Sequence, residues 1–129
     1  MRHSHLAILV LVSCASAEGD PRPATGPVDR GPTGPLVLEL FTSQGCSSCP
    51  PADRLLSTLA KQGEVAGRPL APLAFHVDYW DGLGWADPHA RAAWTQRQHA
   101  YSDALGDNRV YTPELVVGGA VGVVGSQRD

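Results

Sequence analysis

The sequence is short of cysteine and of positive charge, and each shortage excludes a class of protein. Three cysteines in 129 residues are too few for a disulfide framework and, alone, too few for a zinc site built from cysteines. The formal net charge of −3 offers no basic surface for nucleic acid or an anionic membrane. No Gly-rich phosphate loop, His-Glu metalloprotease pattern or Ser-His-Asp order is visible, which argues against a hydrolase, and we predict no cofactor.

The N-terminus has the pattern of an export signal. Arg2 precedes an apolar run over residues 6–12, which is too short to span a bilayer as a helix. We predict a signal peptide over residues 1–17, cleaved after Ala17. In the alternative, Leu-Val-Ser-Cys resembles a bacterial lipobox, and Cys14 becomes a lipid anchor in the membrane. In both cases we expect a periplasmic or secreted protein in oxidising surroundings, where the remaining cysteine pair can form a disulfide.

A linker separates this signal from the folded part. Residues 18–35 hold five Pro and four Gly and show no hydrophobic period. Such a segment cannot bury enough apolar surface to offset its ordering entropy, so we predict that it is disordered. Residues 36–129 remain for one domain with a modest core.

The domain shows a strand–helix–strand pattern followed by a second helix and a hairpin. Short apolar runs predict strands over residues 36–41 and 73–77, with a helix over 46–61 between them. An Asp-Pro pair, read as an N-cap and first helical residue, opens a second helix over 87–106. A Gly-Gly turn joins the strands of a hairpin within residues 115–124. This order predicts an α/β fold with a mixed central sheet and flanking helices.

The candidate chemistry lies in a Cys-x-x-Cys motif, Cys46 to Cys49, that directly follows the first predicted strand. This spacing brings the two sulfurs close enough to bridge. Cys46 is predicted to be the nucleophile because it faces the unpaired N–H groups and the dipole of the helix, which favour a thiolate. Ser47 and Ser48 add hydroxyls that can stabilise it further. Cys49 is predicted to be the resolving thiol.

Two other uses of the cysteine pair stay open. The pair can be a purely structural disulfide, although closing so short a loop gains little entropy. It can also bind a metal ion together with His76, Asp78 or His89, which would make the chain a metal-binding or metallochaperone module.

A second part of the predicted site is Thr112-Pro113, which stands immediately before the hairpin. An X-Pro bond in this position is a candidate cis peptide. Beside the cysteine pair, Pro113 would expose the backbone of Thr112 for strand-like pairing with a substrate chain.

Other polar and aromatic residues are candidates for supporting roles. His76 and Asp78 are two apart on a predicted strand, hence on one face, and either can shuttle protons to Cys49. Trp80, with its aromatic neighbours, can form a rim that recognises substrate, the alternative being core packing. Asp53 is expected to pair with a neighbouring arginine and not to act on sulfur.

Together these features resemble the thioredoxin fold and, more narrowly, the DUF1223 family of exported proteins of unassigned function. The matching segments are FTSQGCSSCPPAD (41–53), FHVDYWDGLGWADP (75–88), TQRQHAYSDALG (95–106), VYTPELVVGG (110–119) and VGSQRD (124–129). The resemblance implies a thioredoxin-like fold and a thiol–disulfide role. We therefore predict an exported oxidoreductase that exchanges with protein thiols or disulfides and with an unidentified redox partner. Family members continue further, so we expect the domain to be incomplete at its C-terminus.

Overall fold

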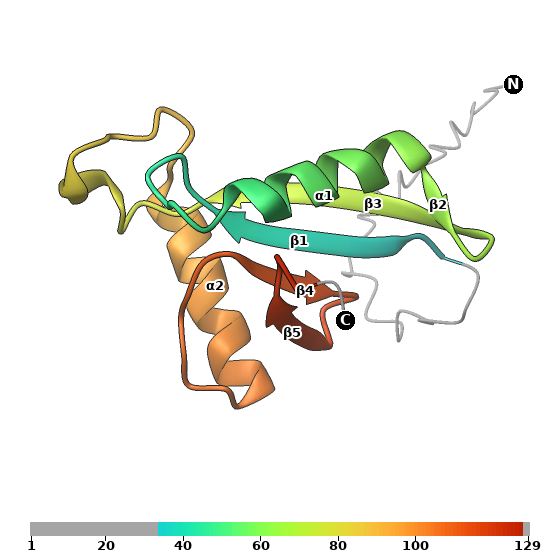
Figure 1. Cartoon of the computed structure of the whole chain (residues 1–129). Helices are drawn as coiled ribbons and strands as arrows, with labels where there is room; N and C mark the ends of the chain where they lie inside the picture. Colours follow the sequence, from blue (N-terminus) through green and yellow to red (C-terminus); the bar gives the residue numbers. More distant parts are fainter. Residues whose placement is uncertain (1–33, 128–129) are drawn as a thin grey trace, which may run out of the picture.

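The computed structural model describes residues 34–127 (Figure 1). The predicted signal peptide, with Cys14, and the predicted linker up to residue 33 lie outside the described residues. Between residues 34 and 127, none of the helices has the length and apolar character needed to cross a membrane.

A five-stranded mixed sheet forms the centre of the fold, in the order β2-β3-β1-β4-β5 (Figure 1). β1 and β3 are parallel, and every other neighbouring pair is antiparallel. The elements are β1 (Leu36–Thr42), α1 (Pro50–Gln62), β2 (Glu64–Val65), β3 (Arg68–His76), α2 (Ala92–Leu105), β4 (Glu114–Val117) and β5 (Val121–Val124). The predicted thioredoxin-like α/β fold with a mixed central sheet is confirmed.

The two helices pack on opposite faces of the sheet, because successive side chains of β1 point to opposite sides. Leu40 joins Ala52 and Leu56 of α1 in one buried cluster. The next residue, Phe41, belongs to a second cluster against which Tyr101 of α2 packs. The carboxyl end of β1 therefore lies between two apolar layers, and the chain that leaves it is held on both sides.

The predicted strand over residues 73–77 corresponds to β3, which begins earlier, at Arg68. The added part contains Pro69 and Pro72, although proline is a poor strand former. The N–H of Leu70 donates to the carbonyl of Gly63, away from β1. Two residues later, Pro72 has the same orientation, at a point where β2 has already ended. Its missing donor therefore faces an unpaired edge and costs no ladder hydrogen bond.

Both helices begin later than predicted. α1 starts at Pro50 with Cys49 as its N-cap, so the cysteine motif lies in turns before the helix and not in the helix. α2 starts at Ala92, not at Asp87. The Asp87 carboxylate instead accepts a hydrogen bond from the amide of His89 and closes a separate turn. The ends of the helices at glycines and the Gly-Gly hairpin are confirmed.

Candidate functional site

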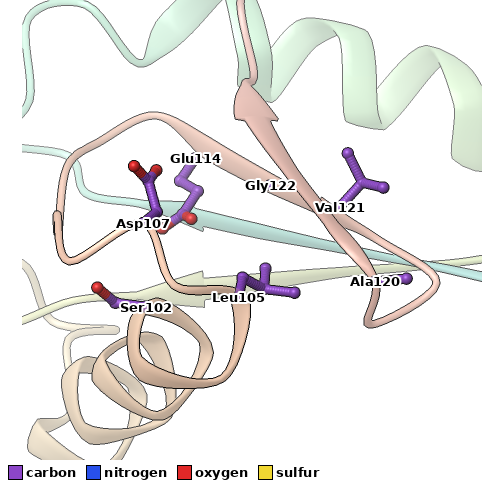
Figure 2. A pocket seen from close by; sticks show the side chains of 7 residues that line it. All are labelled: Ser102, Leu105, Asp107, Glu114, Ala120, Val121 and Gly122. Carbon is purple, nitrogen blue, oxygen red and sulfur yellow. The ribbon is translucent and has the colours of Figure 1, made fainter.

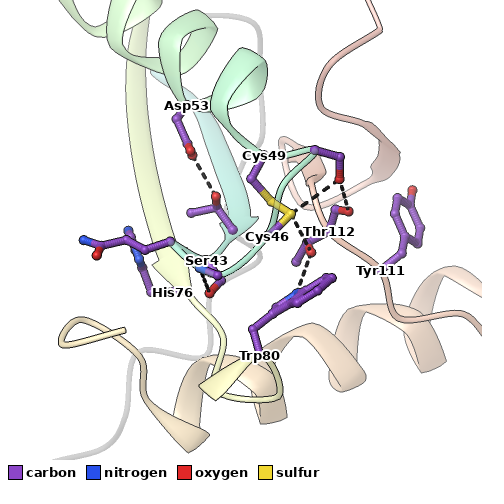
Figure 3. The surroundings of a disulfide bond; sticks show 12 residues. Ser43, Cys46, Cys49, Asp53, His76, Trp80, Tyr111 and Thr112 are labelled. Carbon is purple, nitrogen blue, oxygen red and sulfur yellow. Dashed lines mark hydrogen bonds between the residues drawn. A yellow bond between two sulfur atoms is a disulfide. The ribbon is translucent and has the colours of Figure 1, made fainter. Parts of the chain in front are cut away.

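Cys46 and Cys49 form a disulfide in the turn that joins β1 to α1 (Figure 3). The S–S distance is 2.08 Å and the Cα atoms are 5.4 Å apart. Cys46 is 2% exposed and Cys49 is 0% exposed. Both cysteines are therefore buried, and Cys46 is slightly the more exposed residue of the two.

A chain of hydrogen bonds ends on the sulfur of Cys46 (Figure 3). The indole Nε1 of Trp80 donates to the Thr112 hydroxyl at 2.9 Å, and that hydroxyl donates to Cys46 Sγ at 3.3 Å. The Ser48 hydroxyl lies 3.5 Å from the same sulfur and donates to the carbonyl oxygen of Thr112 at 3.4 Å. The predicted residues Cys46, Thr112 and Trp80 are thus brought together.

The Thr112–Pro113 peptide bond is cis, as predicted. It immediately precedes β4, and the carbonyl oxygen of Pro113 accepts a hydrogen bond from the amide of Gly125. The backbone of Thr112 therefore lies beside the cysteine pair. Its pairing with a substrate chain stays a prediction.

The N–H groups expected to face Cys46 are not available in the first turn of α1. Pro50 and Pro51 occupy the first two helical positions and carry no N–H. The next two amides both donate to the carbonyl oxygen of Cys49. That part of the prediction is wrong, and the hydroxyl of Thr112 stands where an amide donor was expected.

Asp87 fastens the loop after β3 to the turn that carries the cysteines. Its carboxylate accepts hydrogen bonds from the Gln44 amide at 2.8 Å and the His89 amide at 2.9 Å, and it contacts the His76 ring Nδ1 at 2.6 Å. Burial alone would raise the pKa of Asp87, but these contacts outweigh it and lower that pKa below its ordinary value. This role could not be predicted from the sequence, since an Asp-Pro pair is also a helix-start signal.

The two candidate proton shuttles are engaged elsewhere. His76 ends β3 and contacts Asp87, whereas Asp78 lies beyond the strand and accepts a hydrogen bond from the Thr95 hydroxyl at 2.6 Å. Within residues 34–127, neither side chain hydrogen-bonds to Cys46 or Cys49. Their proposed shuttle role stays a prediction, but the shared strand face is wrong.

Among residues 34–127, no arginine pairs with Asp53, contrary to expectation. The hydroxyl of Thr42, the last residue of β1, donates to Asp53 Oδ1 at 2.7 Å. This bond ties the end of the strand to the first turn of α1 across the cysteine turn (Figure 3). Asp53 therefore helps to fix the shape of that turn.

The aromatic residues divide between core and surface. Trp80 is partly buried and packs against the cluster that contains Phe41 and Val116. Tyr79 and Trp85 are exposed. Desolvation raises the pKa of Tyr79 to about 12, so its phenol stays protonated. The ring of Trp80 thus packs on the core, as the alternative predicted, while its role in recognising substrate stays a prediction.

A pocket of about 360 Å³ lies away from the cysteines, between the end of α2 and the β4–β5 hairpin (Figure 2). It is lined by Ser102, Leu105, Asp107, Glu114, Ala120, Val121 and Gly122. None of the predicted site residues lines it. Desolvation raises the pKa of Glu114, and the Asp107 carboxylate adds to the rise, although a hydrogen bond from Gln98 opposes it.

Within the described residues, no preformed cluster of side chains supports the alternative hypothesis of a metal site. Across the part of the chain that the structure describes, no three His, Cys, Asp or Glu side chains are grouped to hold a metal ion. His76 and His89 do lie near each other, with ring centroids 5.3 Å apart.

Comparison with known proteins places the whole folded part in one family. Residues 37–129 match the model of DUF1223, described as a protein of unknown function. A protein from Agrobacterium tumefaciens, whose crystal structure was solved by a structural genomics consortium, is 46% identical in sequence to this chain. The two structures superpose with a TM-score of 0.66. The match covers 73% of this chain and 40% of that one, so this chain spans less than half the length of its structural relative. Comparison with curated proteins gives no match.

Proposed function

This chain belongs to the DUF1223 family, and we propose that it carries out thiol–disulfide exchange with other proteins through Cys46 and Cys49. The observation that carries the proposal is the position of the Cys46 sulfur, in direct contact with the hydroxyl of Thr112 and next to cis-Pro113. A purely structural bridge has no need of a polar donor chain directed at one of its two sulfurs.

The proposed reaction begins when the thiolate of a substrate protein attacks Cys46 Sγ. The S–S bond breaks, and its electron pair leaves with Cys49, which takes up a proton. A second substrate thiolate then attacks the substrate sulfur of the mixed disulfide and releases Cys46 as a thiolate. Two electrons pass from the substrate dithiol to the cysteine pair, and the reverse sequence reduces a substrate disulfide.

The substrates are proposed to be protein thiols or disulfides, held by strand-like pairing with the backbone of Thr112. A separate protein dithiol or disulfide resets the pair. We also propose export, supported by Arg2 and the apolar run over residues 6–12. The mature N-terminus distinguishes the two export routes, because signal cleavage leaves Glu18 and lipidation leaves a modified Cys14.

The test is the reduction potential of the pair, measured in a Cys14→Ser background so that Cys46 and Cys49 are the only thiols. Thiol trapping across dithiothreitol and glutathione ratios is expected to give a value between about −120 and −270 mV, the range of catalytic pairs. A value below about −300 mV would indicate a structural bridge and contradict the proposal. Repeating the titration with a chelator tests the metal alternative, which predicts chelator-dependent protection of the thiols.

A matched pair of variants tests the assignment of roles. Cys49→Ser removes the resolving thiol, so a mixed disulfide between Cys46 and a disulfide-bonded test protein should accumulate. Cys46→Ser leaves only the fully buried sulfur and should trap almost none. Both species are visible on a non-reducing gel. Equal trapping by the two variants would contradict the assignment of Cys46 as nucleophile.

A further inference from the structure

The direction of each hydrogen bond in the chain that reaches Cys46 is fixed by chemistry. An indole N–H can only donate, so the Thr112 oxygen must accept from Trp80. A sulfur in a disulfide carries no proton, so Cys46 can only accept, and the Thr112 hydroxyl must donate to it. Because the Thr112 oxygen accepts from Trp80, the single proton of the Thr112 hydroxyl is directed at the sulfur.

Other donors to this sulfur are few. The first two residues of α1, Pro50 and Pro51, carry no N–H. The Ser48 hydroxyl has one proton, which it shares between the sulfur at 3.5 Å and the carbonyl oxygen of Thr112 at 3.4 Å. The Thr112 hydroxyl, at 3.3 Å, is therefore the best-directed donor to Cys46.

We propose that Trp80 is a positioning residue, which holds the Thr112 hydroxyl as donor to Cys46 and thereby stabilises the Cys46 thiolate once the disulfide is reduced. The inference rests on the proposed function, because only a redox-active pair passes through that thiolate. A hydrogen bond donated to the charged form of a group favours that form. When the donor hydroxyl itself accepts a hydrogen bond, the bond that it donates becomes stronger. Trp80 acts on the sulfur through Thr112 and does not touch it.

The position of Trp80 is itself fixed from two sides. Its ring packs against the buried cluster of Phe41, Val77 and Val116. A Cβ added to Gly45 would lie 3.3 Å from the Trp80 Cβ, so the glycine next to Cys46 permits this close approach. The indole is therefore held against both the core and the cysteine turn, which lets it direct a hydroxyl from a distant part of the chain.

The test is the pKa of the Cys46 thiol, read from the pH dependence of its alkylation by iodoacetamide. A Cys14→Ser, Cys49→Ala background leaves Cys46 as the only thiol. Thr112→Val keeps the shape of the side chain but removes the hydroxyl, and is expected to raise the pKa by about one unit, or about tenfold less thiolate at neutral pH. Trp80→Phe is expected to raise it by a smaller amount. Thr112→Ser should restore the wild-type value.

Two controls separate this role from general loosening of the fold. Trp85→Phe also removes an indole donor, but one bonded to Gln44 and not to Thr112, and it should leave the pKa unchanged. In a Thr112→Val background, Trp80→Phe should have no further effect, since its influence passes through that hydroxyl. An additive effect, or an unchanged pKa in Thr112→Val, would overturn the inference.

Failure of this inference and failure of the proposed function give different results. The alkylation experiment uses an obligatorily reduced variant and reports the hydrogen bonds alone. The potential measured on the intact pair reports whether exchange is feasible. Suppose that the pKa of Cys46 is unchanged in the Thr112 and Trp80 variants while the potential of the intact pair is about −200 mV, roughly the value of known isomerases and glutaredoxins. That result would overturn the role of Trp80 and keep the proposed function. A potential below about −300 mV would overturn the function whatever the pKa.

Discussion

Asp87 and Glu114 are both buried carboxylates, 5% and 2% exposed, yet their pKa values are displaced in opposite directions. Asp87 holds the loop after β3 against Gln44, two residues before Cys46. Glu114 follows Pro113 at the start of β4. Burial raises the pKa of both, so burial alone does not explain the difference.

The number of donors decides the outcome. Asp87 has two backbone amides and the His76 ring around its carboxylate, which together hold its pKa low. Among the described residues, Glu114 has one side-chain donor, Gln98 at 2.6 Å, and the Asp107 carboxylate works against its ionisation. A buried carboxylate therefore stabilises this fold when several donors surround it and destabilises the fold when only one donor contacts it.

Removing the charge of Asp87 is expected to have the largest effect on the stability of the protein. Asp87→Asn puts an amide N–H₂ among groups that donate, and is expected to destabilise the protein by about 2 kcal/mol at pH 7 in urea unfolding. The folded-state pKa is lowered from 3.8, so the stabilisation is present above that value and is lost as pH falls through the folded pKa. The deficit of the variant should therefore shrink below pH 3.8.

The control for this prediction is Asp103→Asn, which removes an exposed carboxylate from α2 and should change stability little. A deficit for Asp87→Asn that stays constant from pH 7 to pH 3 would contradict it. Such a result would mean that the side chain acts through its shape and not its charge.

The features predicted correctly from the sequence are those with local signals. The apolar run of β1, the two-residue cysteine spacing and the Gly-Gly turn each depend on neighbouring residues, so the strand, the disulfide and the hairpin were predictable. The cis peptide was predictable for another reason. Most X-Pro bonds are trans, and Thr112-Pro113 became a strong candidate only together with the Cys-x-x-Cys pattern.

The features missed depend on distant partners. The Asp87-Pro88 pair has the local chemistry of a helix start, but Gln44 lies 43 residues away and takes the carboxylate instead. Trp80 and Thr112 are 32 residues apart, so their hydrogen bond could not be found from spacing. Likewise, Pro72 looks like a strand breaker until the edge beside it is seen to be unpaired.

Glu114 offers the opposite test, since its removal should help. Its folded-state pKa is raised above 4.5, so below that value both states are protonated and the carboxyl has no adverse effect. As pH rises through the folded pKa, keeping the carboxylate buried costs stability. Glu114→Gln keeps an oxygen that accepts from Gln98, and should be more stable than wild type by about 1 kcal/mol at pH 7.

The same comparison by thermal melting should show the two proteins converging near pH 4, where the wild-type carboxyl is protonated. Asp107→Asn is the matched control, because it removes the second charge of the pocket and should give a smaller gain in the same direction. A Glu114→Gln protein that is less stable than wild type at pH 7 but equal to it near pH 4 would show that the ionised carboxylate is the favoured partner of Gln98.

The smallest effect is expected at Trp85, which provides a second contact between Gln44 and the loop that Asp87 holds. Its indole donates to Gln44 Oε1 at 3.2 Å, but its side chain is 59% exposed, so water can replace the bond. Trp85→Phe should therefore change stability by less than about 0.5 kcal/mol in urea unfolding. If its effect instead matched that of Asp87→Asn, the loop would be held mainly by the hydrogen bond from the indole of Trp85 to Gln44. The buried carboxylate would then have no special part in placing Gln44 beside Cys46.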